Sequence, residues 1–204
     1  MVYNLEEIKD DLATLIPKDF YIKYILRSDN WYFESILGVS QDNISCKTDD
    51  FKSIISNSLK ISFNNIAMVG SGKIGFSLTP RSDKLFNCFS PESDVDIAII
   101  SNQLFHDYWD IFRSSYSDIN SYHYKYISRG IYRGYISEFH LSIIDECRKH
   151  WSSIASSSKK ALHSDLYIKH DISYRLYRSW EDFEEYHIQA LEKIKRGDIY
   201  GSTI

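Results

Sequence analysis

The sequence predicts an α/β protein, in which a small mixed β-sheet has helices before and after it. Two short apolar segments, 65–69 (NIAMV) and 93–100 (SDVDIAII), have the length and composition of buried strands. A third segment, 166–177, alternates apolar and polar residues as a half-buried strand does. The chain has 204 residues, of which 43% are hydrophobic, and this is sufficient for a single domain, 1–204, with its own core.

Helical spacing dominates the N-terminal part of the chain, residues 1–60. Apolar residues recur at helical intervals from Leu5 to Ile16, Asn4 is a suitable N-cap, and Pro17 is expected to end this helix. The other elements predicted for this part are a helix at 20–37, a polar loop at 38–50 and a helix at 51–59.

Residues 61–180 are predicted to hold the sheet, and residues 181–204 to hold the last helix. Ser101 is a suitable N-cap for a helix that follows the second strand. Ser179 begins the stretch SWED, which resembles a capping box, and Gly197 can end the helix that starts there. The section in between is predicted to contain a helix at 140–151 and a Ser/Lys-rich turn at 152–160.

Charge, cysteine content and the length of the apolar stretches disfavour several classes of protein. The net charge of −4 disfavours a non-specific nucleic-acid binder, no DNA-binding signature is present, and any contact with a polyanion must be local. Cys46, Cys88 and Cys147 are widely spaced and form no CxxC pair, which argues against a disulfide framework or a zinc site. We therefore expect a reducing, cytoplasmic location. No stretch approaches the ~18 apolar residues of a membrane span, so no membrane partner is expected.

A glycine-rich stretch, 68–77 (MVGSGKIGFS), follows the first strand. It is not a Walker loop, because Ala67 stands where the pattern needs its first glycine and Ile74 stands where it needs Ser or Thr. Gly70, Gly72 and Gly75 fit the dinucleotide pattern G-x-G-x-x-G, but no βαβ repeat surrounds them. Neither of the two common phosphate-loop patterns therefore explains the stretch.

Two acidic residues begin the second strand. Asp94 and Asp96 are two positions apart, so their side chains are expected on the same face, while Val95 and Ile97 face the core. Two neighbouring carboxylates repel each other unless a cation lies between them. Hard oxygen ligands of this kind favour Mg²⁺, which commonly binds through one or two carboxylates and the phosphates of a substrate. Asp94 and Asp96 are thus the predicted ligands of Mg²⁺ or Mn²⁺.

The order of these motifs resembles that of the polymerase-beta-like nucleotidyltransferase superfamily. In that superfamily a Gly-Ser turn, often Gly-Ser-x-x-x-Gly, precedes a strand that carries two acids separated by one apolar residue. Gly70, Ser71 and Gly75 fit the turn, and the segment 94–97 (DVDI) fits the strand. The gap between turn and strand is long and resembles that of the cyclic-oligonucleotide synthases. The segment 175–187 is also similar to the C-terminal part of bacterial nucleotidyltransferase-domain proteins.

The resemblance implies a sheet of the nucleotidyltransferase type and a Mg²⁺-dependent enzyme that uses an NTP as substrate. Such an enzyme transfers NMP to a hydroxyl group of a protein, an RNA, a nucleotide or a small molecule. The backbone at Gly70 and the hydroxyl of Ser71 are expected at the phosphates, and a helix that begins near Gly72 would add a favourable dipole. Lys73 and Arg175 are expected as cationic phosphate contacts. For Arg175 and Arg178, a surface salt bridge with the acidic helix is the competing interpretation.

Active members of this superfamily usually carry a third carboxylate on a neighbouring strand. Asp171 is the first choice, because it is the acid in the middle of the alternating segment 166–177. Glu138 and Asp145 are the alternatives, although their surroundings favour a helix. The catalytic set expected from the resemblance is therefore Asp94, Asp96 and Asp171.

A second class of function remains open. If no third carboxylate is in place, the protein is expected to be a catalytically inactive module that binds a nucleotide or a partner, as in a bacterial defence or toxin–antitoxin system. The sequence shows no Ser-His-Asp signature and no G-x-S-x-G elbow, which disfavours an ordinary hydrolase. The acceptor, the preferred base and the oligomeric state do not follow from the residues.

Overall fold

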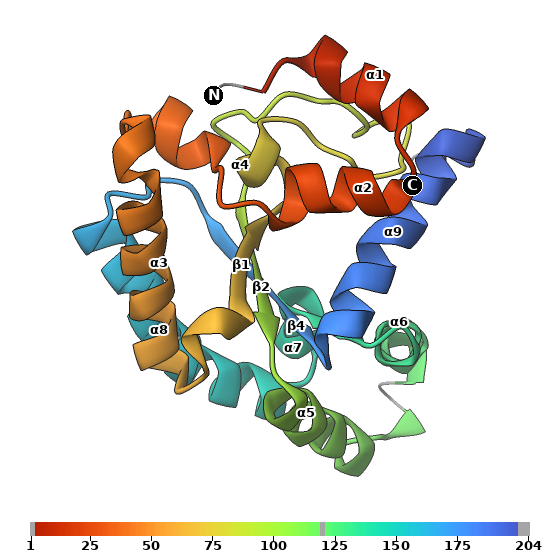
Figure 1. Ribbon diagram of the computed structural model, residues 1–204. Coiled ribbons are helices and arrows are strands. Elements are labelled where there is room, and N and C mark those ends of the chain that lie inside the picture. Colours follow the sequence, from red (N-terminus) through yellow and green to blue (C-terminus); the bar gives the residue numbers. More distant parts are fainter. Residues whose placement is uncertain (1–2, 119–120, 200–204) are drawn as a thin grey trace.

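The structure, a computed structural model, describes residues 3–118 and 121–199, and within these ranges the chain forms a mixed β-sheet flanked by helices (Figure 1). The strand order is β1-β2-β4-β3, with β2 antiparallel to β1 and parallel to β4, and with β3 antiparallel to β4. The strands are β1 (Ile66–Val69), β2 (Val95–Ile100), β3 (Tyr135–Ser137) and β4 (Ile172–Tyr177). The predicted α/β class with a small mixed sheet is confirmed.

The two faces of the sheet are covered by different helices. The α-helices of the described ranges are α1 (Leu5–Thr14), α2 (Pro17–Tyr21), α3 (Ile44–Leu59), α4 (Gly70–Ile74), α5 (Asn102–Ser114), α6 (Ser121–Tyr132), α7 (Glu138–Ile143), α8 (Asp145–Asp165) and α9 (Trp180–Arg196). Figure 1 shows α3 and α8 on one side of the sheet and α2 and α9 on the other.

Alternation along β2 divides the core into two hydrophobic clusters. Val95, Ile97 and Ile99 are buried in the cluster that includes α3, α5 and α8, as the sequence predicts. Ala98 and Ile100 are buried in the other cluster, with α1, α2 and α9. Asp96 lies on the same face of β2 as Ala98 and Ile100. The apolar packing against α1, α2 and α9 therefore does not extend to the beginning of this strand.

The N-terminal helices are shorter than predicted. Asn4 caps α1 by accepting a hydrogen bond from the amide of Glu6, as expected. Pro17 does end the first helix, but it also begins α2, where its missing N–H costs nothing. The single helix predicted at 20–37 is wrong, because two π-helical turns, Ile22–Leu26 and Tyr32–Ile36, flank a break in this segment.

The polar loop predicted at 38–50 is also wrong over its second half. A 3₁₀ turn, Gln41–Asn43, leads directly into α3, which begins at Ile44 rather than near Phe51. Ile44 and Phe51 are both buried on the same side of this helix, and Ser45, Asp49 and Asp50 between them are exposed. The loop prediction fails here because the exposed face of a helix is rich in polar residues, as a loop is.

The Ser/Lys-rich turn predicted at 152–160 lies inside the long helix α8. Its serines are compatible with the helix because several donate hydrogen bonds to backbone carbonyls three residues earlier, as Ser153 does to His150. Ser158 is fully buried and its hydroxyl lies 2.8 Å from that of Tyr174 on β4. The helix predicted at 140–151 is divided between α7 and α8.

The strand β4 covers only the second half of the segment 166–177. The first half is an irregular approach in which Tyr167 has a positive φ of 59°. After β4, Ser179 caps α9 by accepting from the amide of Asp182, and Gly197 ends the helix with a φ of 75°. The last residues of the predicted C-terminal part, 200–204, lie outside the described residues.

Two further observations concern the environment of the chain. No helix of the described residues is long and apolar enough to span a membrane. Cys46, Cys88 and Cys147 are free thiols, and Cys147 is buried in the core cluster between α8 and the sheet.

Two histidines, the buried His140 and the half-buried His187, predict how the stability of the fold depends on pH. Burial, and secondly the charge of Arg175, lower the pKa of both His140 and His187 to about 4. An unfolded histidine titrates near about 6.5, so below this pH the unfolded chain binds protons that the folded chain does not. The contribution of the two neutral histidines to the free energy of unfolding is therefore fully present above pH ~6.5, and it is lost as the pH falls towards about 4. We expect the urea concentration at the unfolding midpoint to be lower at pH ~5 than at pH ~7.

The variant His187→Asn tests the source of this dependence. Asparagine can keep a hydrogen bond like the one that Nδ1 of His187 donates to the carbonyl of Phe183, at 2.8 Å. The pH dependence of the unfolding midpoint should therefore become shallower in the variant. Equal slopes for the two proteins would show that other groups cause it.

Candidate functional site

The Gly-Ser turn joins β1 directly to the short helix α4 and contacts the acidic strand. Gly70 has a φ of +68°, which side chains with a Cβ rarely adopt. A Cβ on Gly70 would lie 2.5 Å from Oδ2 of Asp96, so the carboxylate occupies the space that any other residue would fill. Both the backbone conformation and this close approach therefore require glycine. The turn and Asp96 therefore lie side by side.

Asp94 and Asp96 lie together at the beginning of β2. Asp96 is in register with Val69 of β1 and with Ser173 of β4, and its Oδ1 accepts a hydrogen bond of 2.7 Å from the hydroxyl of Ser173. Burial raises the pKa of Asp94, and the negative charges of Asp96 and Asp171 raise it further. This corner of the sheet therefore carries a concentrated negative charge.

The neighbouring strand brings Asp171 to the same level as Asp94. The residues that follow them, Ile172 and Val95, are in register in the parallel pair of β4 and β2. The amide of Val95 donates a hydrogen bond of 2.8 Å to the carbonyl of Asp171. The side chain of Asp171 is exposed, and its charge acts on Asp94. Asp171 therefore lies level with Asp94, directly before the strand that pairs with β2, and its role as a third carboxylate stays a prediction.

The two alternative acids, Glu138 and Asp145, have partners of their own. Glu138 begins α7 and is held by Trp151, by Lys159 and by the backbone amide of Tyr174, at 2.7, 2.8 and 3.0 Å. Tyr174 belongs to the opposite face of the sheet from Asp96. Asp145 begins α8 and forms an ion pair with Arg148. These contacts of Glu138 and Asp145 do not include Asp94 or Asp96.

The acidic corner fits a divalent cation through two ligands rather than three. Within residues 3–118 and 121–199, no group of three or more His, Cys, Asp and Glu side chains is arranged to hold a metal ion. Asp94 and Asp96 remain as a pair of hard oxygen ligands whose mutual repulsion a cation would relieve. Mg²⁺ is commonly bound by one or two carboxylates, with water and phosphate oxygens completing its shell. The donor set therefore suits Mg²⁺ bound together with a phosphorylated ligand.

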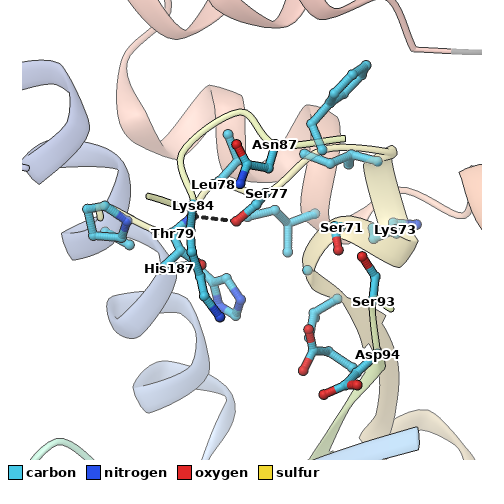
Figure 2. Close-up of a pocket in the computed structure, with 18 of the residues that line it drawn as sticks. Ser71, Lys73, Ser77, Leu78, Thr79, Lys84, Asn87, Ser93, Asp94 and His187 are labelled. Carbon is cyan, nitrogen blue, oxygen red and sulfur yellow. Dashed lines mark hydrogen bonds between the residues drawn. The ribbon is translucent and has the colours of Figure 1, made fainter. Parts of the chain in front are cut away.

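A cavity of about 530 Å³ opens in front of Gly70, Ser71, Asp94 and Asp96. Figure 2 shows Ser71, Ser93 and Asp94 on one side of it and His187 of α9 on the other. Its volume is in the range of small-ligand sites.

The long gap between the two sequence motifs forms one wall of this cavity. Residues 76–93 leave α4 and return as an arm, which a β-bridge between Phe76 and Cys88 closes. The amide of Ser77 also donates to the carbonyl of Asn87, at 2.9 Å. Lys84 of the arm lines the cavity, and its positive charge opposes the rise in the pKa of Asp94. The sequence does not reveal the arm, because the segment has no periodicity that distinguishes it from a plain loop.

Arg175 lies in the inner wall of the cavity, on the same face of the sheet as Asp96. Its guanidinium carbon is 4.9 Å from the ring centre of Tyr186 and 5.3 Å from that of Tyr135, and Nη1 donates to the hydroxyl of Tyr186 at 2.5 Å. Its buried Nε has no hydrogen-bond partner in the described residues, and Arg175 forms no ion pair there. A buried cation without a paired carboxylate is a suitable contact for an anionic ligand.

Arg178, in contrast, is paired. Its guanidinium makes two hydrogen bonds of 2.7 Å to the carboxylate of Asp182 in the first turn of α9. For this arginine the salt-bridge interpretation is the correct one.

Lys73 is buried, and its ammonium group donates to the backbone carbonyls of Arg27 and Asp29. Burial lowers its pKa to about 8. A contact between Lys73 and a phosphate would require it to leave these carbonyls, so its predicted role stays a prediction. The expected helix dipole is also weak, because α4 has only five residues. Phosphate contacts at this turn would rest on backbone N–H groups and on Ser71.

The site also contains residues that the sequence pattern does not single out. Ser173 holds Asp96, Lys84 comes from the arm, and Tyr186 and His187 come from α9. The signal for Ser173 was its place two positions after Asp171 on the same strand face. The α9 residues are typical of any amphipathic helix, and only the tertiary packing brings them to the cavity.

Comparisons of the chain with protein-family models, with curated proteins and with solved structures give no significant match, so the site stands on its own geometry.

Proposed function

We propose that this protein is a Mg²⁺-dependent nucleotidyltransferase with a sheet of the nucleotidyltransferase type. In this proposal it transfers NMP from an NTP to a hydroxyl group of a protein, an RNA, a nucleotide or a small molecule. One observation carries the proposal. The Gly70–Ser71 turn and the Asp94–Asp96 pair, which are separated along the chain, meet at the wall of a single cavity.

Each group at the cavity has a role that suits this reaction. Asp94 and Asp96 would hold Mg²⁺ or Mn²⁺, and the cation would neutralise the charge of the phosphates during transfer. The backbone at Gly70 and the hydroxyl of Ser71 would contact phosphate oxygens. Arg175 and Lys84 supply positive charge on the other walls. Asp171 would accept the proton of the attacking hydroxyl, because it is the acid nearest to the pair on the adjacent strand.

A second candidate function is a nucleotide-binding module without turnover. It is favoured by the finding that no three acidic or other ligating side chains of the described residues are arranged around a common point. The exposed side chain of Asp171 is the group that separates the two functions. The free thiols of all three cysteines support a cytoplasmic location for either function.

The variant Asp94→Asn/Asp96→Asn should lose binding of NTP that depends on Mg²⁺ or Mn²⁺, because the cation loses both protein carboxylates. Its free energy of unfolding should change by less than about 1 kcal/mol, since like-charge repulsion is relieved while the side-chain carbonyl of an asparagine at position 96 can still accept the hydrogen bond of Ser173. Equilibrium binding of labelled NTPs, with and without metal, measures the first effect. The variant Asp107→Asn/Asp110→Asn, on α5, is the control with the same change of charge. Equal metal-dependent binding by both double variants would refute the assignment.

The variant Gly70→Val should weaken NTP affinity far more than Ser71→Ala, because the added side chain displaces the carboxylate of Asp96. The control is Gly38→Val. Gly38 has nearly the same φ, +67°, but nothing lies within 4 Å of the position that a Cβ would take there, so this variant carries the backbone strain alone. Thermal unfolding should show that Gly38→Val is destabilised by the backbone strain, and that Gly70→Val is destabilised at least as much, because it adds the clash with Asp96. If Gly38→Val impaired NTP binding as strongly, strain rather than the lost approach would be the cause.

The variant Asp171→Asn should keep NTP binding and lower turnover by orders of magnitude, because it removes the expected proton acceptor. Release of pyrophosphate from each NTP, with Mg²⁺ or Mn²⁺, measures turnover. Unchanged turnover would remove Asp171 from the catalytic set. If the wild-type protein binds NTP but releases no pyrophosphate with any acceptor, the non-catalytic function is the correct one.

A further inference from the structure

The outer face of α6 carries a stripe of tyrosines and cations. Five residues of this face are three or four positions from a neighbour in the set, which places them on one side of the helix. They are Tyr122, Lys125, Tyr126, Arg129 and Tyr132. Tyr122, Tyr126 and Tyr132 are 67%, 41% and 91% exposed. The opposite side of α6, with Ile127, is buried against the core. We call these five residues the α6 stripe.

The charge of the α6 stripe is of one sign. From Ser121 to Ser137 the sequence contains three cations and no acidic residue. Lys125 and Arg129 form no ion pair within residues 3–118 and 121–199, although many other surface cations of this chain do. This local excess of positive charge stands against the net charge of −4 of the whole chain. It therefore marks a surface on which an anion would be attracted.

The aromatic residues narrow the kind of anion. Most exposed helix faces are filled by charged and small polar residues, whereas three tyrosines here expose large flat surfaces to solvent. The hydroxyls of Tyr122 and Tyr126 lie 2.9 Å apart, and their rings contact edge to face. Ring faces bind flat partners, and cations spaced between them bind charges at regular intervals. A single-stranded nucleic acid has both properties, because its bases are unpaired and a phosphate joins each base to the next.

We propose that the α6 stripe binds single-stranded nucleic acid by stacking bases on its tyrosines and by pairing phosphates with Lys125 and Arg129. Along the helix axis the stripe is about 15 Å long, which accommodates a few nucleotides. Duplex is disfavoured, since its bases are already stacked inside the helix and offer no free face.

This surface is separate from the cavity. The strand β3 follows α6 and begins opposite Tyr177, at the end of β4, and only its last residue, Ser137, reaches Arg175 of the cavity wall. Asp96 is in register with Ser173, nearer the beginning of β4. In Figure 1, α6 and α4 lie at different ends of the sheet. The inference therefore does not depend on the proposed nucleotidyltransferase activity, and NTP binding is a control for it rather than its test.

Fluorescence anisotropy with labelled oligo-dT and oligo-U of about 12 nucleotides, at low salt, tests the proposal. The wild-type protein should bind at least one of them. The variant Tyr122→Ala/Tyr126→Ala/Tyr132→Ala should bind about a hundredfold more weakly, because three stacking surfaces are lost. The control Tyr167→Ala removes a tyrosine that is 71% exposed elsewhere, and it should bind as the wild type does.

The charge variant Lys125→Gln/Arg129→Gln gives an independent readout. Each phosphate contact contributes roughly −0.7 to the slope of log K against log salt, so the slope should become less steep by about 1.4. Circular dichroism and metal-dependent NTP binding should be unchanged in all variants. The proposal is overturned if the wild type binds neither oligonucleotide, if the tyrosine variant binds them as well as the wild type does, or if duplex binds more tightly. It is also overturned if the wild type is a dimer that the tyrosine variant dissociates, since the stripe is then a self-interface.

Discussion

The parallel pairing of β2 with β4 is the constraint on which the candidate site depends. This pairing sets Asp96 beside Ser173 and brings the residue before β4, Asp171, level with the residue before β2, Asp94. A shift of one residue in the register would turn Asp171 and Ser173 towards the opposite face, where the main hydrophobic cluster packs. The apolar residues that alternate with the acids, such as Val95 and Ile97, fix the register through their burial. The core therefore determines the geometry of the polar corner.

The cavity is electrostatically divided. Asp94 and Asp96 lie on one wall, at the beginning of β2, and Arg175 of β4 lies on the inner wall. The arm of residues 76–93 contributes Lys84 together with the acids Asp83 and Glu92. Arg175 is held by two tyrosine rings and by a hydroxyl rather than by a carboxylate. This arrangement fixes the position of the guanidinium without neutralising it, so its charge stays available to a ligand. The proposed substrate, a metal-bound triphosphate, would present a cation to the acidic wall and anionic oxygens to the basic one.

The sequence alone predicts those parts of the protein in which local pattern and burial agree. The period of the apolar residues and the spacing of the polar ones predict the strands β1 and β2 and the shared face of Asp94 and Asp96. They also predict the helix caps at Asn4, Ser101 and Ser179. The errors have a common cause. In α3 and α8, polar residues on an exposed helical face have the composition of a loop, and only the buried contacts made across the fold show that the helix continues. The cavity wall from α9 and the arm is a tertiary feature that no local pattern encodes.

The buried ammonium group of Lys73 has a consequence for the architecture of the chain. Its two acceptors, the carbonyls of Arg27 and Asp29, belong to the break between the π-helical turns near the N-terminus. A shortened protein without this segment would leave a buried donor unsatisfied directly behind the Gly-Ser turn, at a cost of about 1–3 kcal/mol or more. The N-terminal helices are thus part of the scaffold that shapes the turn, and the sheet with its acids is not a minimal unit that can be excised.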